Sequence, residues 1–137
     1  MKKIHVLAAA TMTAVSLLAF RSFAGQKRTD EITVIPSLRT AMGSMGDARN
    51  SGDANQSIGC VVAVYGSDGE GLSAYCTAQD KNGAFAYCYF PSTTIDTYVK
   101  VLQSIQPNSR FYFTWDASYR CVDLEVHSES SYRPLTP

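Results

Sequence analysis

The stretch LSAYCTAQDKNGAFAYCYF, residues 72–90, decides how this chain is expected to fold. In each half, small side chains alternate with polar or aromatic ones, which is the two-residue period of a β-strand. Between the halves, Lys81-Asn82-Gly83 has the composition of a tight hairpin loop, because glycine readily adopts the left-handed conformation that such a loop needs. The stretch therefore predicts a β-hairpin with an Ala/Cys face on one side and Tyr75, Tyr87 and Tyr89 on the other.

The hairpin also bears on how the four cysteines pair. Its register places Cys76 directly opposite Cys88, at a separation near that of a disulfide. We therefore favour a Cys76–Cys88 disulfide. Cys60 is then left to pair with Cys121 across a loop of about 60 residues, which stabilises by roughly 4 kcal/mol in the chain-entropy model. Cys121, however, alternates with acidic residues, as on a solvent-facing strand, so all three connectivities stay open at this point.

Further strands and one helix surround the hairpin. Residues 58–65 alternate as a strand, and an apolar stripe from Ile95 to Ile105 predicts a helix. Two more strands are expected at 110–115 and at 119–127, the latter with Val122 and its alternate neighbours pointing inward. The order βββαββ predicts an α+β fold over 58–127. It is a small, mostly antiparallel sheet with one helix on its Ala/Cys face, stabilised by two disulfides.

The first residues have the composition of a signal peptide. A basic start precedes an apolar run from Ile4 to Phe20, and Ser22-Phe23-Ala24 supplies the small residues at which signal peptidases cut. We expect residues 1–24 to be removed before Gly25, with no membrane span afterwards. Four cysteines in a short exported chain indicate two disulfides. The predicted location is therefore exported, either periplasmic or secreted.

Residues 25–57 are expected to be a flexible N-terminal segment or linker. Residues 32–35 allow a short strand that Pro36 ends, because proline lacks the amide hydrogen. Residues 37–49 show a weak helical spacing that is interrupted by Gly43 and Gly46. This stretch is predicted either to rest loosely on the sheet as a helix or to become ordered on a partner. Residues 50–57 offer almost nothing to bury. At the other end, 128–137 is expected to be a polar tail.

The charge pattern excludes some partners. Signal-peptide removal takes away Lys2, Lys3 and Arg21, so the mature chain has fewer basic than acidic residues. A weakly acidic chain with scattered Lys and Arg is a poor binder of nucleic acid or of an anionic membrane surface.

Catalytic and metal-binding patterns are weak. His127 is the only histidine after residue 24, and it lies at a strand end, where a general base is not held in place. The cysteines are not arranged in the close pairs that are typical of zinc sites. Two turns offer oxygen ligands that suit calcium, Asp68 and Glu70 in one and Asp80 and Asn82 in the other, but these residues are also the ones that turns select. We expect no cofactor, no metal and no catalytic residue.

The aromatic residues, chiefly tyrosines, are the one feature of the composition that suggests a binding surface. Tyr75, Tyr87 and Tyr89 share a strand face, and if the helix covers the other side, they form an exposed platform for a protein or a glycan. The alternative is an ordinary sheet surface, since tyrosine favours strands. The predicted function is a small exported binding or structural module that is non-catalytic. Two alternatives are a secreted hydrolase that uses carboxylates such as Asp116 or Asp123, and a secreted protease inhibitor. Ligand identity and oligomeric state are left open.

Overall fold

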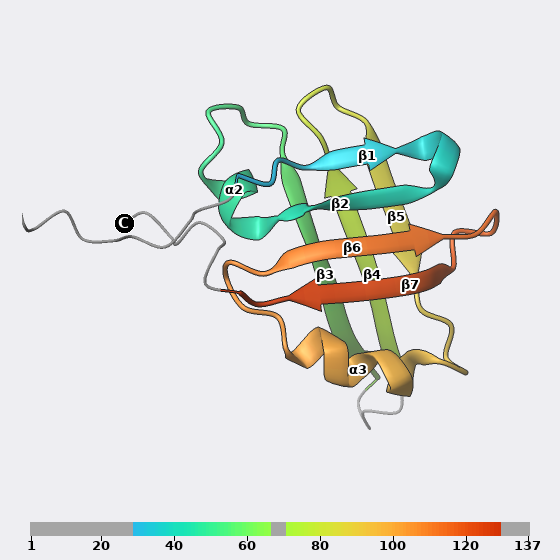
Figure 1. The fold of residues 1–137 in the computed structure, drawn as a ribbon. Coiled ribbons are helices and arrows are strands. Elements are labelled where there is room, and N and C mark those ends of the chain that lie inside the picture. Colours follow the sequence, from blue (N-terminus) through green and yellow to red (C-terminus); the bar gives the residue numbers. More distant parts are fainter. Residues whose placement is uncertain (1–28, 67–70, 130–137) are drawn as a thin grey trace, which may run out of the picture.

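The computed structural model describes residues 29–66 and 71–129 (Figure 1). The predicted signal peptide, the turn residues Asp68 and Glu70, and most of the predicted tail lie outside these residues. The elements in chain order are β1 (Thr33–Ile35), the 3-10 turn η1 (Pro36–Leu38), β2 (Thr40–Ser44), α2 (Met45–Arg49), β3 (Ser57–Tyr65), β4 (Gly71–Gln79), β5 (Phe85–Tyr89), α3 (Ile95–Gln103), β6 (Arg110–Trp115) and β7 (Cys121–His127).

The strands form two antiparallel sheets that pack face to face. One sheet has the order β1-β2-β6-β7, and the other has the order β3-β4-β5. Figure 1 shows the strands of one sheet running across those of the other, with α3 beside β7. The predicted α+β class and the two disulfides are confirmed. The prediction of a single sheet is wrong, because each sheet hides its apolar face by packing on the other.

The predicted hairpin is present with its predicted register. Cys76 pairs with Cys88 and Tyr75 with Tyr89 across β4 and β5. The Asp80 carboxylate accepts hydrogen bonds from the amides of Asn82 at 2.9 Å and of Ala84 at 3.0 Å, and so closes the loop. This carboxylate, which was considered above as a calcium ligand, is therefore occupied by its own turn.

The core lies between the two sheets. The small inward side chains of β4 and β5, such as Ala78 and Ala86, form one cluster with the fully buried Phe111 and Phe113 of β6. The large rings of β6 thus pack against small side chains in the interior. We expected the helix to cover the Ala/Cys face, but the second sheet does so. Helix α3 packs instead beside β7 and at β3 and β4.

Residues 25–57 were predicted to be a flexible segment or linker. The prediction is wrong for the part from β1 to α2, because these elements are folded into the domain. Strand β2 lies inside its sheet, between β1 and β6, and Ala41 and Ser44 are fully buried. A side chain at Gly43 would collide with the Ile32 backbone, with 2.8 Å between the added Cβ and the Ile32 Cα. Gly43 therefore allows the chain to pack closely on itself and does not weaken a helix. Of the predicted helical stretch 37–49, only Met45–Arg49 is α-helical.

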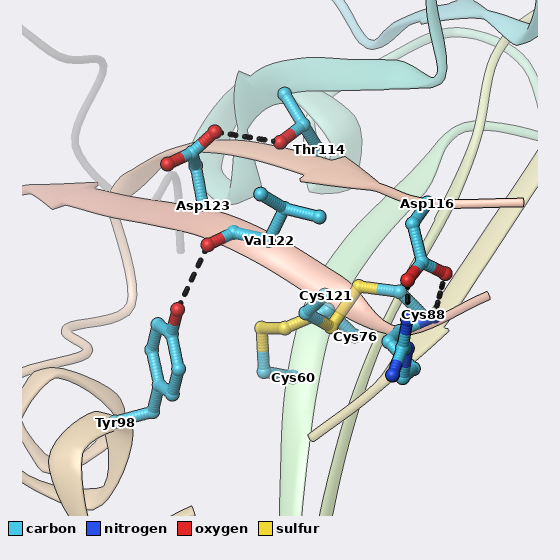
Figure 2. Close-up of a disulfide and its surroundings, with 10 residues drawn as sticks. Cys60, Cys76, Cys88, Tyr98, Thr114, Asp116, Cys121, Val122 and Asp123 are labelled. Atoms are coloured by element: carbon cyan, nitrogen blue, oxygen red, sulfur yellow. Dashed lines mark hydrogen bonds and ion pairs between the residues drawn. A yellow bond between two sulfur atoms is a disulfide. The ribbon is translucent and has the colours of Figure 1, made fainter. Parts of the chain in front are cut away.

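The favoured disulfide pairing was also wrong. The bonds are Cys60–Cys76, within one sheet, and Cys88–Cys121, between the two sheets (Figure 2). Cys76 lies directly opposite both Cys60 and Cys88. The Cα atoms of Cys60 and Cys76 are only 4.0 Å apart, which is the short spacing of a pair without mutual backbone hydrogen bonds. Side chains are closest in such pairs, so the bond forms on that side.

An irregular register explains how Cys121 reaches the core. Thr114 pairs with Asp123, but Trp115 pairs with Cys121, so Val122 is an extra residue at a β-bulge. The bulge turns Cys121 inward, although it shares its strand parity with Asp123. Val122 is therefore exposed, contrary to the predicted inward position. No helix in the described ranges is long and apolar enough to cross a lipid bilayer.

Candidate binding face

The outer face of the β3-β4-β5 sheet carries only uncharged side chains. On β4, the residues of this face alternate with the buried Ala74, Cys76 and Ala78. On β3 and β5, the residues of this face are the cross-strand partners of those β4 residues. We call this surface the tyrosine face. It consists of Ser57, Gly59, Val61, Ala63 and Tyr65 of β3, Ser73, Tyr75, Thr77 and Gln79 of β4, and Phe85, Tyr87 and Tyr89 of β5.

The structure brings the three predicted tyrosines together and leaves them accessible. Tyr87 and Tyr89 are each 38% exposed, whereas Tyr75 is half-buried between the neighbouring strands. The rings of Tyr75 and Tyr87 lie 5.8 Å apart, within the range of favourable aromatic contact. Strand β5 also presents Phe85, which is 58% exposed. The face therefore combines exposed aromatic rings with the polar hydroxyl groups of its tyrosines.

A pocket adjoins this face at the edge of β5. It has a volume of about 340 Å³ and is lined by Pro36, Arg39, Phe85, Trp115, Asp116, Ala117 and Tyr119. We call it the corner pocket. The turns that follow β1 and β6 meet there, since the Trp115 amide donates to the Arg39 carbonyl at 3.1 Å. Phe85 belongs to both the pocket and the tyrosine face, so the two form one continuous surface.

Two residues of the corner pocket have an uncommon backbone conformation. Arg39 and Tyr119 adopt the left-handed conformation, with φ of 49° and 58°, and neither is glycine. Such residues are uncommon and are held in place by their surroundings, often at functional sites. The Arg39 guanidinium forms no ion pair within 29–66 and 71–129. It is therefore available to an external carboxylate.

Asp116, in contrast, is fully engaged by its own turn. Its carboxylate accepts the amide hydrogens of Arg120 at 3.0 Å and of Ser118 at 2.8 Å. It also forms an ion pair with the Arg120 side chain at 2.7 Å. These interactions, chiefly the backbone hydrogen bond from Arg120, lower the pKa of Asp116 below its ordinary value. The negative charge of Asp116 is thus balanced by Arg120, whereas Arg39 has no ion pair in the part of the chain that the structure describes.

The other candidate residues do not assemble into a site. The His127 ring contacts Glu125 at 3.1 Å and Glu129 at 3.7 Å, so acids surround it and no nucleophile adjoins it among the described contacts. Asp123 accepts a hydrogen bond from the Thr114 hydroxyl. All four cysteines are oxidised. Across the part of the chain that the structure describes, no three His, Cys, Asp or Glu residues converge as metal ligands.

The sequence analysis did not name Phe85, Arg39 or Tyr119 as binding residues, and the sequence pattern could have indicated only Phe85. Phe85 alternates with Tyr87 and Tyr89, so the strand period was enough to place it on the same face. Arg39 and Tyr119 are far apart in the chain, and only the meeting of two turns brings them together.

Comparison with protein-family models, with curated proteins and with solved structures finds no match to this chain. The function is therefore argued from the residues and their geometry.

Proposed function

We propose that this chain is a small, non-catalytic binding module that docks a protein partner on its tyrosine face. The observation that carries the proposal is an uncharged sheet surface, rich in exposed aromatic side chains, in a chain of which 18% of the residues are charged. The centres of protein interfaces are depleted in charge and enriched in aromatic residues. Tyrosine supplies a large contact area and a polar hydroxyl for little conformational entropy.

The corner pocket adds a charge requirement for the partner. Arg39 stands at the rim of the aromatic surface without an internal ion pair in the described residues, and guanidinium groups bind carboxylates with two parallel hydrogen bonds. The expected partner surface is therefore an apolar or aromatic patch that is flanked by an Asp or Glu side chain. A flat sheet surface suits such a protein patch better than it suits a small molecule, which usually needs an enclosing cavity.

We also propose that the protein acts outside the cytoplasm. The two disulfides are typical of an oxidising compartment. The sequence of residues 1–24 supports export by a signal peptide to the periplasm or beyond. The intact mass of exported protein is expected to correspond to a chain that starts at Gly25 and lacks the hydrogens of all four thiols. A different start, or free thiols in folded protein, would remove the support for this location.

The binding proposal is tested by affinity purification followed by quantitative binding. Immobilised wild-type protein is exposed to the extracellular protein fraction of the producing cells, and a retained protein is purified for calorimetry. Tyr87→Ser and Tyr89→Ser are each expected to weaken that complex by about 1 kcal/mol or more, or about fivefold, as aromatic anchors do. Tyr112→Ser is the matched control, because Tyr112 is a half-buried tyrosine of the other sheet. It is expected to leave binding unchanged.

Two results would contradict the proposal. In the first, the complex is unaffected by both Tyr87→Ser and Tyr89→Ser, which means that the partner binds elsewhere. In the second, a glycan array shows binding that depends on Tyr87 while no protein is retained, which assigns the face to a glycan.

A further inference from the structure

Strand β3 is the longest outer strand of the two sheets, and helices α2 and α3 contact it without adding a strand to its outer edge among residues 29–66 and 71–129. Strand β1 is only three residues long. Strand β5 has five residues, and at its last residue the Tyr89 amide donates to the Tyr119 carbonyl at 3.0 Å. The edge of β7 is flanked by α3, whose Tyr98 hydroxyl donates to the Val122 carbonyl at 2.8 Å (Figure 2). Within the described residues, β3 pairs with β4 alone, along nine residues.

The unpaired backbone groups on this edge can be assigned. Cys60 and Cys76 form a pair without mutual backbone hydrogen bonds, as their close Cα atoms show. The Cys60 amide and carbonyl therefore point away from β4. By alternation, the same holds for Val62 and Val64, and these groups present the start of a new antiparallel ladder at the open edge.

The side chains of β3 lack the usual protection of an open edge. Proteins commonly protect such strands with lysine, proline or short length. The sequence of β3 is SIGCVVAVY, which contains no charge and no proline. Four of its large apolar residues are exposed, namely Val61, Val62, Val64 and Tyr65. A long, neutral strand that is exposed on both faces is suited to pairing with another strand.

We propose that β3 pairs antiparallel with β3 of a second copy of this chain, around a two-fold axis at Val62. This register places Val62 opposite Val62, Cys60 opposite Val64 and Val61 opposite Ala63. It also places Tyr65 of each copy opposite Gly59 of the other. A side chain at Gly59 would meet open space, so the exposed Tyr65 ring finds room to lie across the glycine. No charged group opposes another in this register, which favours a second copy as the occupant.

The assembly is expected to stop at a dimer. A two-fold axis uses the same edge in both copies, so the pairing closes on itself. The other outer strands are shorter than β3, and β5 and β7 each carry a hydrogen bond at their outer edge. The dimer joins the two tyrosine faces into one sheet surface of six strands. Self-pairing rests on the edge of β3 and not on the proposed protein partner, so it can be tested on the purified protein alone.

The test measures the molar mass of folded, oxidised protein by light scattering or sedimentation over a range of concentrations. Wild type is expected to change from monomer to dimer as its concentration rises. Val62→Lys and Val62→Glu each place two like charges at the axis, and each is expected to weaken the dimer at least ~10-fold. An equimolar mixture of the two variants places a lysine opposite a glutamate at the axis, and dimers are expected to return. The mixture excludes misfolding as the reason for the loss in either variant.

Val122→Lys is the matched control. Val122 is 51% exposed and Val62 43%, and both are valines on strands, but Val122 lies on β7 and not on the open edge. This variant is expected to dimerise like wild type. The proposal is overturned if wild type stays monomeric at every concentration, or if both Val62 variants dimerise unchanged. It is also overturned if their mixture remains monomeric or if wild type grows beyond dimers.

Discussion

At the scale of single residues, Arg39 shows how a strained backbone can indicate function. Its left-handed conformation costs an L-residue about 1–2 kcal/mol, whereas glycine adopts it without that penalty. Arg39→Gly is therefore expected to raise the free energy of unfolding by up to about 1 kcal/mol, after the greater entropy of the unfolded glycine is subtracted. The same change is expected to weaken binding of the proposed partner. Chemical denaturation and calorimetry measure the two effects.

Arg39→Lys separates the backbone effect from the charge effect. It keeps the side-chain charge and the unfavourable φ, so stability is expected to stay within about 0.5 kcal/mol of wild type. A loss of stability in Arg39→Gly would show that the arginine side chain supports the fold and is not reserved for a ligand.

Asp116 provides a prediction about pH. Its pKa in the folded chain is lowered from 3.8, first of all by the Arg120 backbone hydrogen bond. A lowered folded pKa means that the carboxylate stabilises the fold above pH 3.8, and that this contribution is lost as the pH falls through the folded pKa. The melting temperature of wild type is therefore expected to fall more steeply on acidification below about pH 4 than that of Asp116→Asn. Parallel pH profiles for the two proteins would contradict this role.

At the scale of elements, the two disulfides connect different parts of the fold. Cys60–Cys76 joins neighbouring strands across a separation of 16 residues, whereas Cys88–Cys121 joins the two sheets across 33. In the chain-entropy model, removing the first pair by Cys→Ser changes costs about 3 kcal/mol and removing the second costs about 4 kcal/mol. Unfolding of the two double variants measures this difference. Peptide mapping without reduction should recover both bonds, and a peptide that links Cys76 to Cys88 would disprove the pairing.

At the scale of the whole molecule, the tyrosine face is expected to be separable from the core. Tyr87→Ser removes an exposed ring and its contact with Tyr75, so it is expected to cost about 1 kcal/mol of stability. Phe113→Ala, in the fully buried layer between the sheets, is expected to cost about 3–5 kcal/mol. Thermal or chemical unfolding compares the two. A similar loss in both variants would mean that Tyr87 belongs to the core and not to a binding surface.

Local pattern determined most of the elements and part of the site. The strand period and the Lys81-Asn82-Gly83 loop were enough to place the hairpin, its register and the shared face of Tyr75, Tyr87 and Tyr89. These features depend on neighbours in the chain, because alternation and turn geometry act over a few residues. The α+β class followed for the same reason.

Tertiary structure alone decided how those elements combine. Strand β2 looked like a weak helix, because its glycine serves a close approach to Ile32 that no local pattern encodes. Cys121 paired with Cys88 because a bulge turned it inward and the second sheet packed on the Ala/Cys face. Arg39 and Tyr119 came together only where two turns met. Each of these outcomes depends on contacts between residues far apart in sequence, and such contacts are formed by packing the two sheets rather than by the period of any one segment.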